Sequence, residues 1–166
     1  MVKQFITTCL LVLISLAHAQ SISNKTINQL HTNNMKNDAK LVVTEFLTAV
    51  QQGDNAKLAQ IIHPDIEWDQ PGKNSLSGIK HSNAEVFRMV GKMFELSANT
   101  LRLTDFKSIS LNGNKVACML HWNAAQPAGG ILDVDNIDVY TVTNGQITKA
   151  EIFAADEVSE NKFWGE

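Results

Sequence analysis

Apolar and polar positions divide this chain into a helical part followed by a part built of strands. Between Asp38 and Leu96, apolar residues recur three or four positions apart, a spacing that places them on one side of a helix. From Leu101 onward, apolar and polar residues alternate, as they do in strands with one buried face. The sequence therefore predicts an α+β fold in which helices cover one face of a curved antiparallel sheet.

Three helices are expected from their end signals. Asp38 is a plausible N-cap of the first helix, and Gly53 ends it. Asp54 begins a second, shorter helix, which the run His63-Pro64-Asp65 breaks. Ser82, with Glu85 three residues later, forms the capping box of the third. A short strand is expected between the last two helices, at Ile66–Asp69.

Four longer strands follow, and tight turns join two pairs of them. The dipeptides Asn112-Gly113 and Asn144-Gly145 are typical of two-residue hairpin turns. The expected strands are 101–111, 116–123, 131–142 and 147–155. This order favours an antiparallel meander after the helices.

Asp138 lies on the more apolar face of the strand 131–142. Alternation puts it beside Val134, Asn136 and Tyr140, while Asp133 and Asp135 point to the other face. A carboxylate is costly to bury without partners, so such a group either finds hydrogen bonds or keeps its proton. Asp138 is therefore either a structural acid, bonded to a neighbouring strand or at a wet rim, or part of a small-molecule site.

The first residues have the pattern of a cleavable signal peptide. Lys3 precedes the apolar run Phe5–Leu16, and Ala17-His18-Ala19 offers small residues at the two positions that signal peptidase reads. We expect a signal peptide at 1–19 cleaved after Ala19, a flexible tether at 20–37, and one domain at 38–166. The mature protein is expected to be secreted or periplasmic.

The net charge and the cysteine content argue against nucleic-acid binding, membrane binding and an internal disulfide. Of the 14 Lys and Arg residues, Lys3 leaves with the signal peptide, so 13 face 17 acidic residues, a net charge of −4. A mildly acidic chain without a basic cluster is a poor candidate for binding nucleic acid or a membrane surface. Cys118 is the single cysteine after cleavage, so the domain has no internal disulfide.

Three stretches of the sequence resemble a known superfamily. They are Phe46–Asp54 with its Gln-Gly-Asp ending, His63–Trp68 followed by Leu76-Ser77-Gly78, and Asn136–Tyr140 with the turn Asn144–Ile147. In this order they resemble the SnoaL-like and ketosteroid-isomerase-like branch of the nuclear transport factor 2-like superfamily. The resemblance covers roughly Asp38 to Asp156. It implies a cone-shaped fold in which a curved sheet wraps three helices around an apolar pocket, but it leaves the function open.

The resemblance to ketosteroid isomerase assigns polar roles to particular positions. The acid that donates a hydrogen bond to the substrate oxygen falls on Asp138. The general base falls on Asp69 when counted back from Leu76-Ser77-Gly78, and on Trp68 when counted forward from the second helix. The tyrosine of the oxyanion hole falls on Phe46, which has no hydroxyl. Asp69 and Asp138 are thus the candidate catalytic residues, and Asp69 is otherwise an acid preceding the turn at Pro71-Gly72.

The remaining candidate residues would contact a ligand rather than react with it. These pocket residues are Phe46, Trp68, Leu120, Trp122 and Tyr140. Those on the strand 116–123 are equally consistent with ordinary core. No cofactor is expected, and His63, His81 and His121 lack the spacing of a metal site.

Two functions remain in competition at this point. One is an exported domain that binds a small apolar molecule, with or without acid–base chemistry of an isomerase or cyclase kind. The alternative is a non-catalytic dimerisation or protein-interaction module. In either case a homodimer is expected through the outer sheet face, which carries Ile137, Val139 and Phe153. An enzyme should bring Asp69 and Asp138 into one cavity, whereas an interaction module needs no cavity.

Overall fold

The computed structural model describes residues 39–165, except for the side chains of residues 108 and 109. The expected signal peptide and tether lie outside this range and stay predictions. The helices are α2 (Ala39–Gln52), α3 (Asn55–Ile61), α4 (Asn83–Leu96) and α5 (Glu157–Trp164). The strands are β1 (Ile62–Gln70), β2 (Gly78–Lys80), β3 (Arg102–Asn112), β4 (Lys115–Ala125), β5 (Ile131–Thr143) and β6 (Gln146–Ala154).

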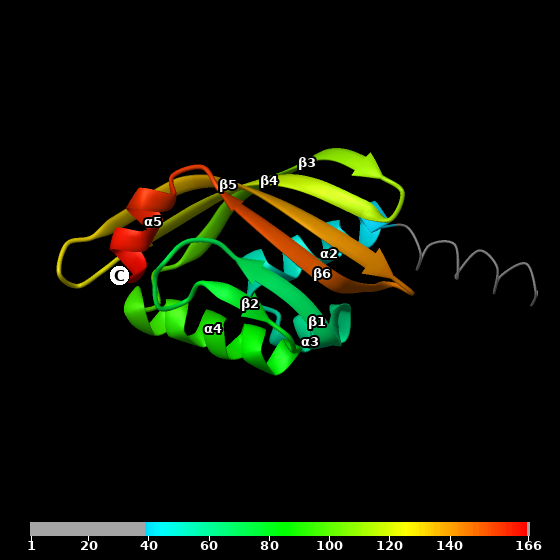
Figure 1. Ribbon diagram of the computed structural model, residues 1–166, viewed down its shortest axis with the longest axis horizontal. Helices are drawn as coiled ribbons and strands as arrows, with labels where there is room; N and C mark the ends of the chain where they lie inside the picture. Colours follow the sequence, from blue (N-terminus) through cyan, green and yellow to red (C-terminus); the bar gives the residue numbers. More distant parts are fainter. Residues whose placement is uncertain (1–38, 166) are drawn as a thin grey trace, which may run out of the picture. The chain divides into compact units, whose positions relative to one another are not determined.

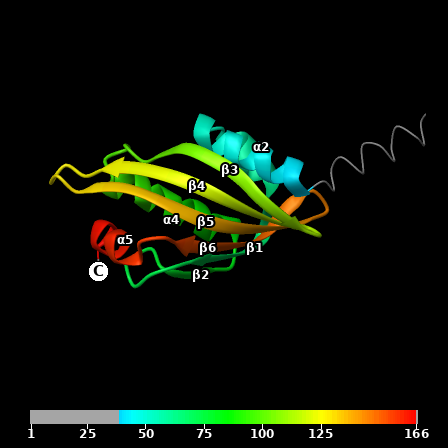
Figure 2. The ribbon, with the colours of Figure 1, turned by 90° about the horizontal axis from the view of Figure 1, so that it is seen from above.

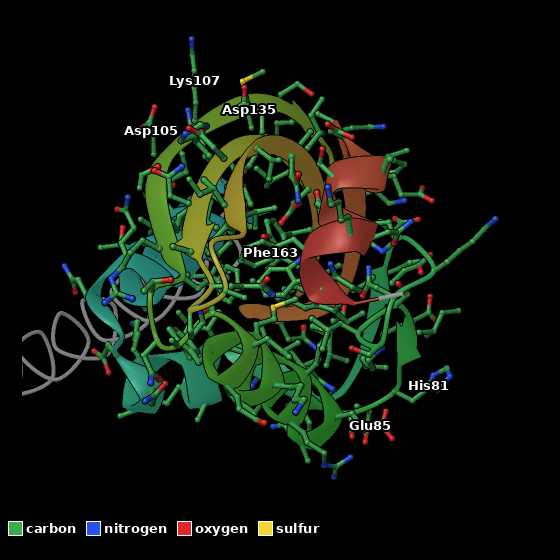
Figure 3. All side chains as sticks on the ribbon, turned by 90° about the vertical axis from the view of Figure 1, so that its left-hand side faces the viewer. His81, Glu85, Asp105, Lys107, Asp135 and Phe163 are labelled. Carbon is green, nitrogen blue, oxygen red and sulfur yellow. The ribbon has the colours of Figure 1, made fainter. Side chains whose placement is uncertain are left out.

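The strands form one curved sheet in the order β2-β1-β6-β5-β4-β3. Its long strands run side by side in Figure 1, and the end-on view of Figure 3 shows them arching over α4. Helix α2 packs against β3, β4 and β5 and is seen beside β3 in Figure 2. The α+β class and the helices-then-meander order are therefore confirmed.

The sequence signals locate the helix ends well. Asp54 caps α3, because its Oδ1 accepts a hydrogen bond from the Lys57 amide at 3.0 Å. Ser82 caps α4 by accepting from the Glu85 amide at 3.3 Å, and Glu85 accepts from the His81 amide at 2.7 Å. The first turn of α4 is thus held from both sides, as the capping box predicts.

Tight turns join the long strands close to where they were expected. Asn144 and Gly145 both have positive φ, 53° and 80°, which suits the mirror-image turn that matches strand twist. In the other hairpin Asn112 pairs with Lys115, so its turn residues are Gly113 and Asn114, one position later than predicted.

Strand β1 departs from the prediction in length and direction. It runs from Ile62 to Gln70 rather than over 66–69, and it pairs parallel to β6 while its partner β2 is antiparallel. The register shifts between Ile62 and Glu67, and Pro64 lies inside that irregular stretch. Proline has no amide hydrogen to donate, so an irregular stretch is where a strand tolerates it.

Helix α5 was not expected from the sequence. Asp156 caps it by accepting from the Ser159 amide at 3.0 Å. Its last turn is tied to two loops: Gln126 Nε2 donates to the Phe163 carbonyl at 2.6 Å, and Asn161 Oδ1 accepts from the Lys73 amide at 2.8 Å. The rings of Phe163 and Trp164 pack edge-on, 4.6 Å apart. As Figures 1 and 3 show, α5 lies at one end of the curved sheet.

Candidate functional site

A cavity of about 480 Å³ lies between the inner face of the sheet and helices α2 and α4. Aromatic and aliphatic side chains make up most of its walls, among them Phe46, Trp68, Phe87, Met93 and Trp122. Polar side chains enter it from β5 and α5. A largely apolar cavity of this size with a few polar groups is typical of small-molecule sites.

Asp138 is the most deeply buried acid of this cavity. The alternation of β5 holds as predicted: Leu132, Val134, Asn136, Asp138, Tyr140 and Val142 are all buried. Asp138 is only 3% exposed, and its Oδ2 accepts a hydrogen bond from the Tyr140 hydroxyl at 2.7 Å. Its other oxygen, Oδ1, has no hydrogen-bond partner among the described residues. One oxygen of this carboxyl is therefore hydrogen-bonded, and the other is buried without a partner among the described residues.

Burial sets the protonation of Asp138. Loss of water raises the pKa of Asp138 to about 7, against the opposing effect of the Tyr140 hydrogen bond, and the nearby Glu160 raises it further. At neutral pH a substantial fraction of this acid holds its proton. A protonated carboxyl can donate a hydrogen bond to a ligand oxygen, which a carboxylate cannot do.

Tyr140 is held in place by aromatic neighbours. Its ring packs edge-on against Phe46 at 5.3 Å and against Trp68 at 6.3 Å between ring centroids. Burial, together with the adjacent Asp138, raises the pKa of Tyr140 well above its usual range. The hydroxyl therefore stays protonated and donates to Asp138. The resemblance assigned the oxyanion-hole tyrosine to Phe46, which has no hydroxyl, whereas the buried hydroxyl of this cavity is that of Tyr140 on β5.

A second acid, Glu160 of α5, lines the same cavity and is 5% exposed. In the amide orientation that satisfies both groups, Asn136 Nδ2 donates to Glu160 Oε1 at 2.9 Å and to the Asp135 carbonyl at 2.8 Å. Burial raises the pKa of Glu160 to about 7; the Asn136 bond opposes this shift, and Asp156 and Glu157 add to it. The cavity thus contains two acids with elevated pKa values.

Sequence reasoning missed Glu160 because it assigned no helix after β6. A signal was present. Asp156 is a good N-cap, acids follow it in the first turn, and the apolar pair Phe163-Trp164 supplies a buried side. Glu160 and Trp164 are four residues apart, so they share one face of the helix and both line the cavity.

The comparisons with known proteins agree with this architecture. The family model described as a SnoaL-like domain matches residues 43–150. The chain belongs to the SnoaL-like domain family. An uncharacterized protein of Mycobacterium tuberculosis is 30% identical to it over 131 residues, 78% of this chain and 99% of that protein.

Solved structures show the same fold. A protein of unknown function with a cystatin-like fold from Xanthomonas campestris is 33% identical, with a TM-score of 0.73 over 77% of this chain and 98% of its own. Bal32a, from a soil-derived mobile gene cassette, is 19% identical, with a TM-score of 0.72 over 76% of this chain and 96% of its own. Other matches are nuclear transport factor 2-like proteins, so the predicted fold is confirmed.

Asp69 does not lie in the cavity of this SnoaL-like domain. It is exposed on β1, between the buried Trp68 and Gln70, which both line the cavity. Because side chains alternate along a strand, a residue between two inward-facing neighbours faces outward. The prediction that Asp69 faces the cavity, made by counting back from Leu76-Ser77-Gly78, is therefore wrong. The count from the second helix, which gave Trp68, identifies the inward position, and Trp68 Nε1 there donates to Gln70 Oε1 at 3.1 Å.

The other candidate contacts divide between cavity wall and core. Phe46, Trp68, Trp122 and Tyr140 line the cavity as predicted. Leu120 does not: it has 0% exposed surface and belongs to the filled core, so that prediction is corrected. Cys118 pairs with Asp138 across β4 and β5, and burial raises the pKa of its thiol to about 11, which leaves it unreactive.

Residues 39–165 contain neither a cluster of metal ligands nor a membrane-spanning helix. No group of three or more His, Cys, Asp or Glu side chains there is placed to hold a metal ion. None of the helices in that range is long and apolar enough to cross a membrane.

Proposed function

We propose that this SnoaL-like domain binds a small, mostly apolar molecule in the cavity and that Asp138 is its main polar contact. The observation that carries the proposal is the carboxyl of Asp138, buried in an apolar wall with Tyr140 on Oδ2 and no partner among the described residues on Oδ1. Leaving a buried polar atom unpaired costs about 1–3 kcal/mol. A ligand that pairs with it recovers part of that cost.

The chemistry follows from the protonation of Asp138. In its neutral form Asp138 donates a hydrogen bond to a ketone or similar oxygen, and this bond strengthens as negative charge develops on that oxygen. Such a donor stabilises an enol or enolate, the intermediate of isomerase-like and cyclase-like reactions. The acid thus supports acid–base chemistry in addition to binding.

The chain contains its own reporter for ligand binding. Its three tryptophans, Trp68, Trp122 and Trp164, all line the cavity. A ligand in the cavity should therefore change the intrinsic fluorescence. We suggest titrating 2-tetralone, a neutral ketone, and naphthalene, which has no oxygen, at pH 5.5 and pH 8.5.

The pH dependence separates Asp138 from the rest of the wall. Binding of 2-tetralone should weaken about tenfold at pH 8.5, where Asp138 loses its proton, while naphthalene binds alike at both pH values. Asp138→Asn keeps an N–H donor, so its affinity for 2-tetralone should no longer depend on pH. Asp133→Asn, on the outer face of the same strand, is the matched control and should behave as wild type. No fluorescence response to either compound would contradict the binding proposal.

A second candidate function, protein interaction, is favoured by one observation. Met119, Ile137 and Phe153 are cross-strand neighbours on β4, β5 and β6, and they are 44%, 43% and 56% exposed. We propose that two copies of the domain pair through this outer face. This use of the sheet is compatible with a ligand in the cavity, because the two sites lie on opposite faces of the same strands.

A further inference from the structure

We propose that Glu160 is the general base of this site: it removes a proton from the carbon next to the carbonyl of a neutral ligand while Asp138 donates to the carbonyl oxygen. The proposal deepens the function proposed above and rests on it. It fills the position left empty by Asp69, which faces solvent from β1. The base then comes from α5 instead of the sheet.

The placement of Glu160 is fixed through Asn136. Asn136 and Asp138 share the inner face of β5, and two residues along a strand span about 7 Å. Asn136 donates to Glu160 Oε1 at 2.9 Å, so the carboxyls of Glu160 and Asp138 enter the cavity from the same wall, close enough for the Glu160 charge to raise the pKa of Asp138. No hydrogen bond within residues 39–165 engages the other oxygen of Glu160, Oε2.

The residues of the cavity offer no competing base. Among the described residues that line it, Asp138 and Glu160 are the only carboxyls, and there is no histidine, lysine or cysteine. Arg102 is the one cation, and its guanidinium is engaged by the carbonyls of Asn99 and Leu101 at 3.0 and 2.6 Å. The remaining polar groups are amides and the protonated Tyr140, none of which accepts a proton readily.

The charge of Glu160 affects the protonation of Asp138. Burial raises the pKa of both to about 7, and Glu160 adds to the shift of Asp138 because ionising one opposes ionising the other. The groups acting on Glu160 are Asn136 of β5 and the acids Asp156 and Glu157 at the start of α5. Near neutral pH the pair therefore holds about one proton, which the reaction requires.

The proposed step is balanced without a cofactor. The C–H bond next to the carbonyl breaks, and its proton forms an O–H bond with the Glu160 carboxylate. The released electron pair forms a C=C bond, the carbonyl π pair moves to oxygen, and that oxygen takes the Asp138 proton. To complete the cycle, the enol O–H returns its proton to Asp138, the C=O bond re-forms, and the C=C pair takes a proton from Glu160. Delivery to another carbon of a conjugated ligand is isomerisation. Delivery to the same carbon is exchange when Glu160 has first traded its proton for a deuteron of the solvent. Because the pair carries about one negative charge, the ligand class is neutral carbonyl compounds rather than carboxylates.

Hydrogen–deuterium exchange at the α-carbon of 2-tetralone in D₂O, followed by NMR, tests this step. Glu160→Gln keeps the size of the side chain and an oxygen for Asn136 but cannot take a proton. We expect its exchange rate to fall by about 10²-fold or more, while 2-tetralone binding by fluorescence changes less than about threefold. Asp69→Asn, on the exposed side of β1, is the control and should exchange at the wild-type rate.

The pH profile provides a second readout. The wild-type rate should be bell-shaped, because one acid must be ionised and the other protonated. Asp138→Asn should lose the alkaline limb and keep the acid limb that belongs to Glu160. If circular dichroism shows that Glu160→Gln folds poorly, Glu160→Asp takes its place in the test. This variant retracts the carboxyl by one methylene and should keep part of the exchange.

Each failure has a distinct meaning. Wild-type exchange that survives Glu160→Gln in a folded variant, or 2-tetralone binding without any exchange, overturns the role of Glu160 and leaves the binding function intact. Absence of 2-tetralone binding overturns both. Loss of exchange in Glu160→Gln with binding retained supports the base.

Discussion

Asp135 and Asp138 are three residues apart on β5 and lie in opposite environments. Asp135 is on the outer face, more than half exposed, with its Oδ1 2.7 Å from His121 Nδ1. Figure 3 shows it on the outside of the arch with Asp105 and Lys107. Asp138 is on the inner face and 3% exposed, and among the described residues only the Tyr140 side chain forms a hydrogen bond with its carboxyl. An aspartate on the outer face keeps its charge in contact with water, whereas burying one on the inner face costs free energy.

Each face of β5 contains residues that its own environment does not favour. The inner face buries Asn136 and Asp138, and the outer face exposes Ile137 beside Met119 and Phe153. Buried polar groups reduce the stability of a fold, and exposed apolar rows favour association. These departures from the usual pattern are where we place the ligand and the partner, so the comparison links each face to a proposal.

The largest expected effect concerns pH. A raised acid pKa means that the folded state binds the proton more tightly, so Asp138 favours folding at low pH and loses that contribution as pH rises from about 4 to about 7. The shift corresponds to about 4 kcal/mol. Urea unfolding from pH 4 to pH 8.5 should show wild type losing up to this amount relative to Asp138→Asn. Asp133→Asn should follow wild type, and parallel curves for wild type and Asp138→Asn would contradict the raised pKa.

Truncating Asp138 should reduce the free energy of unfolding much more than truncating Asp133 on the exposed face of the same strand. At pH 5, where charge on Asp138 is small, Asp138→Ala leaves the buried Tyr140 hydroxyl without its acceptor and should reduce the free energy of unfolding by about 1–3 kcal/mol. Asp133→Ala on the exposed face should change it by less than about 0.5 kcal/mol. Chemical denaturation measures both. Equal costs would mean that the hydrogen bond from Tyr140 contributes nothing.

The outer face can be tested by charge. Ile137→Lys places an ammonium in the centre of the row formed with Met119 and Phe153, and it should weaken the proposed dimer at least about thirtyfold. Light scattering at tens of micromolar should then report a monomer. Val158→Lys on α5, where Val158 is 79% exposed, is the control and should leave the dimer unchanged. A wild-type monomer under these conditions would remove the dimer proposal.

The smallest expected effect is at His121. Its hydrogen bond to Asp135 is the main cause of a raised pKa, and Asp133 and Asp105 add to it. This pair therefore favours the folded state below the unfolded pKa of histidine, and the effect disappears as pH rises through the raised value. Asp135→Asn should lower the His121 pKa in an NMR titration with little change in unfolding, because the pair is exposed. An unchanged titration would show that the contact does not form in solution.

Local patterns predicted the parts of this structure that depend on neighbouring residues. The alternation of β5 placed Asp138 and Tyr140 on the buried face, and capping residues located the starts of α3 and α4. The parallel pairing of β1 with β6 joins segments about 80 residues apart, which no local period reports. The error at Asp69 has the same origin, since a one-residue difference in counting along β1 exchanges its two faces.

For a related reason, the sequence predicted only one of the two cavity acids. Asp138 stands out as an acid among apolar residues on a long strand, whereas Glu160 lies in an eight-residue helix among other acids. Its burial depends on how α5 docks through Asn161 and the Phe163 carbonyl, and these bonds join it to loops far away in the sequence. Tertiary contacts, not sequence pattern, make this glutamate part of the cavity.

The position of α5 has a consequence for how this cavity can be modified. The match to the SnoaL-like domain ends at residue 150, whereas α5 begins at Glu157. Asp138 and Tyr140 lie within the matched range, whereas Glu160 and Trp164 lie beyond it. Replacing α5 should change one acid and one wall of the cavity while the sheet stays intact. In this domain the chemistry of the cavity can therefore be altered by editing a helix of eight residues, without redesigning the core.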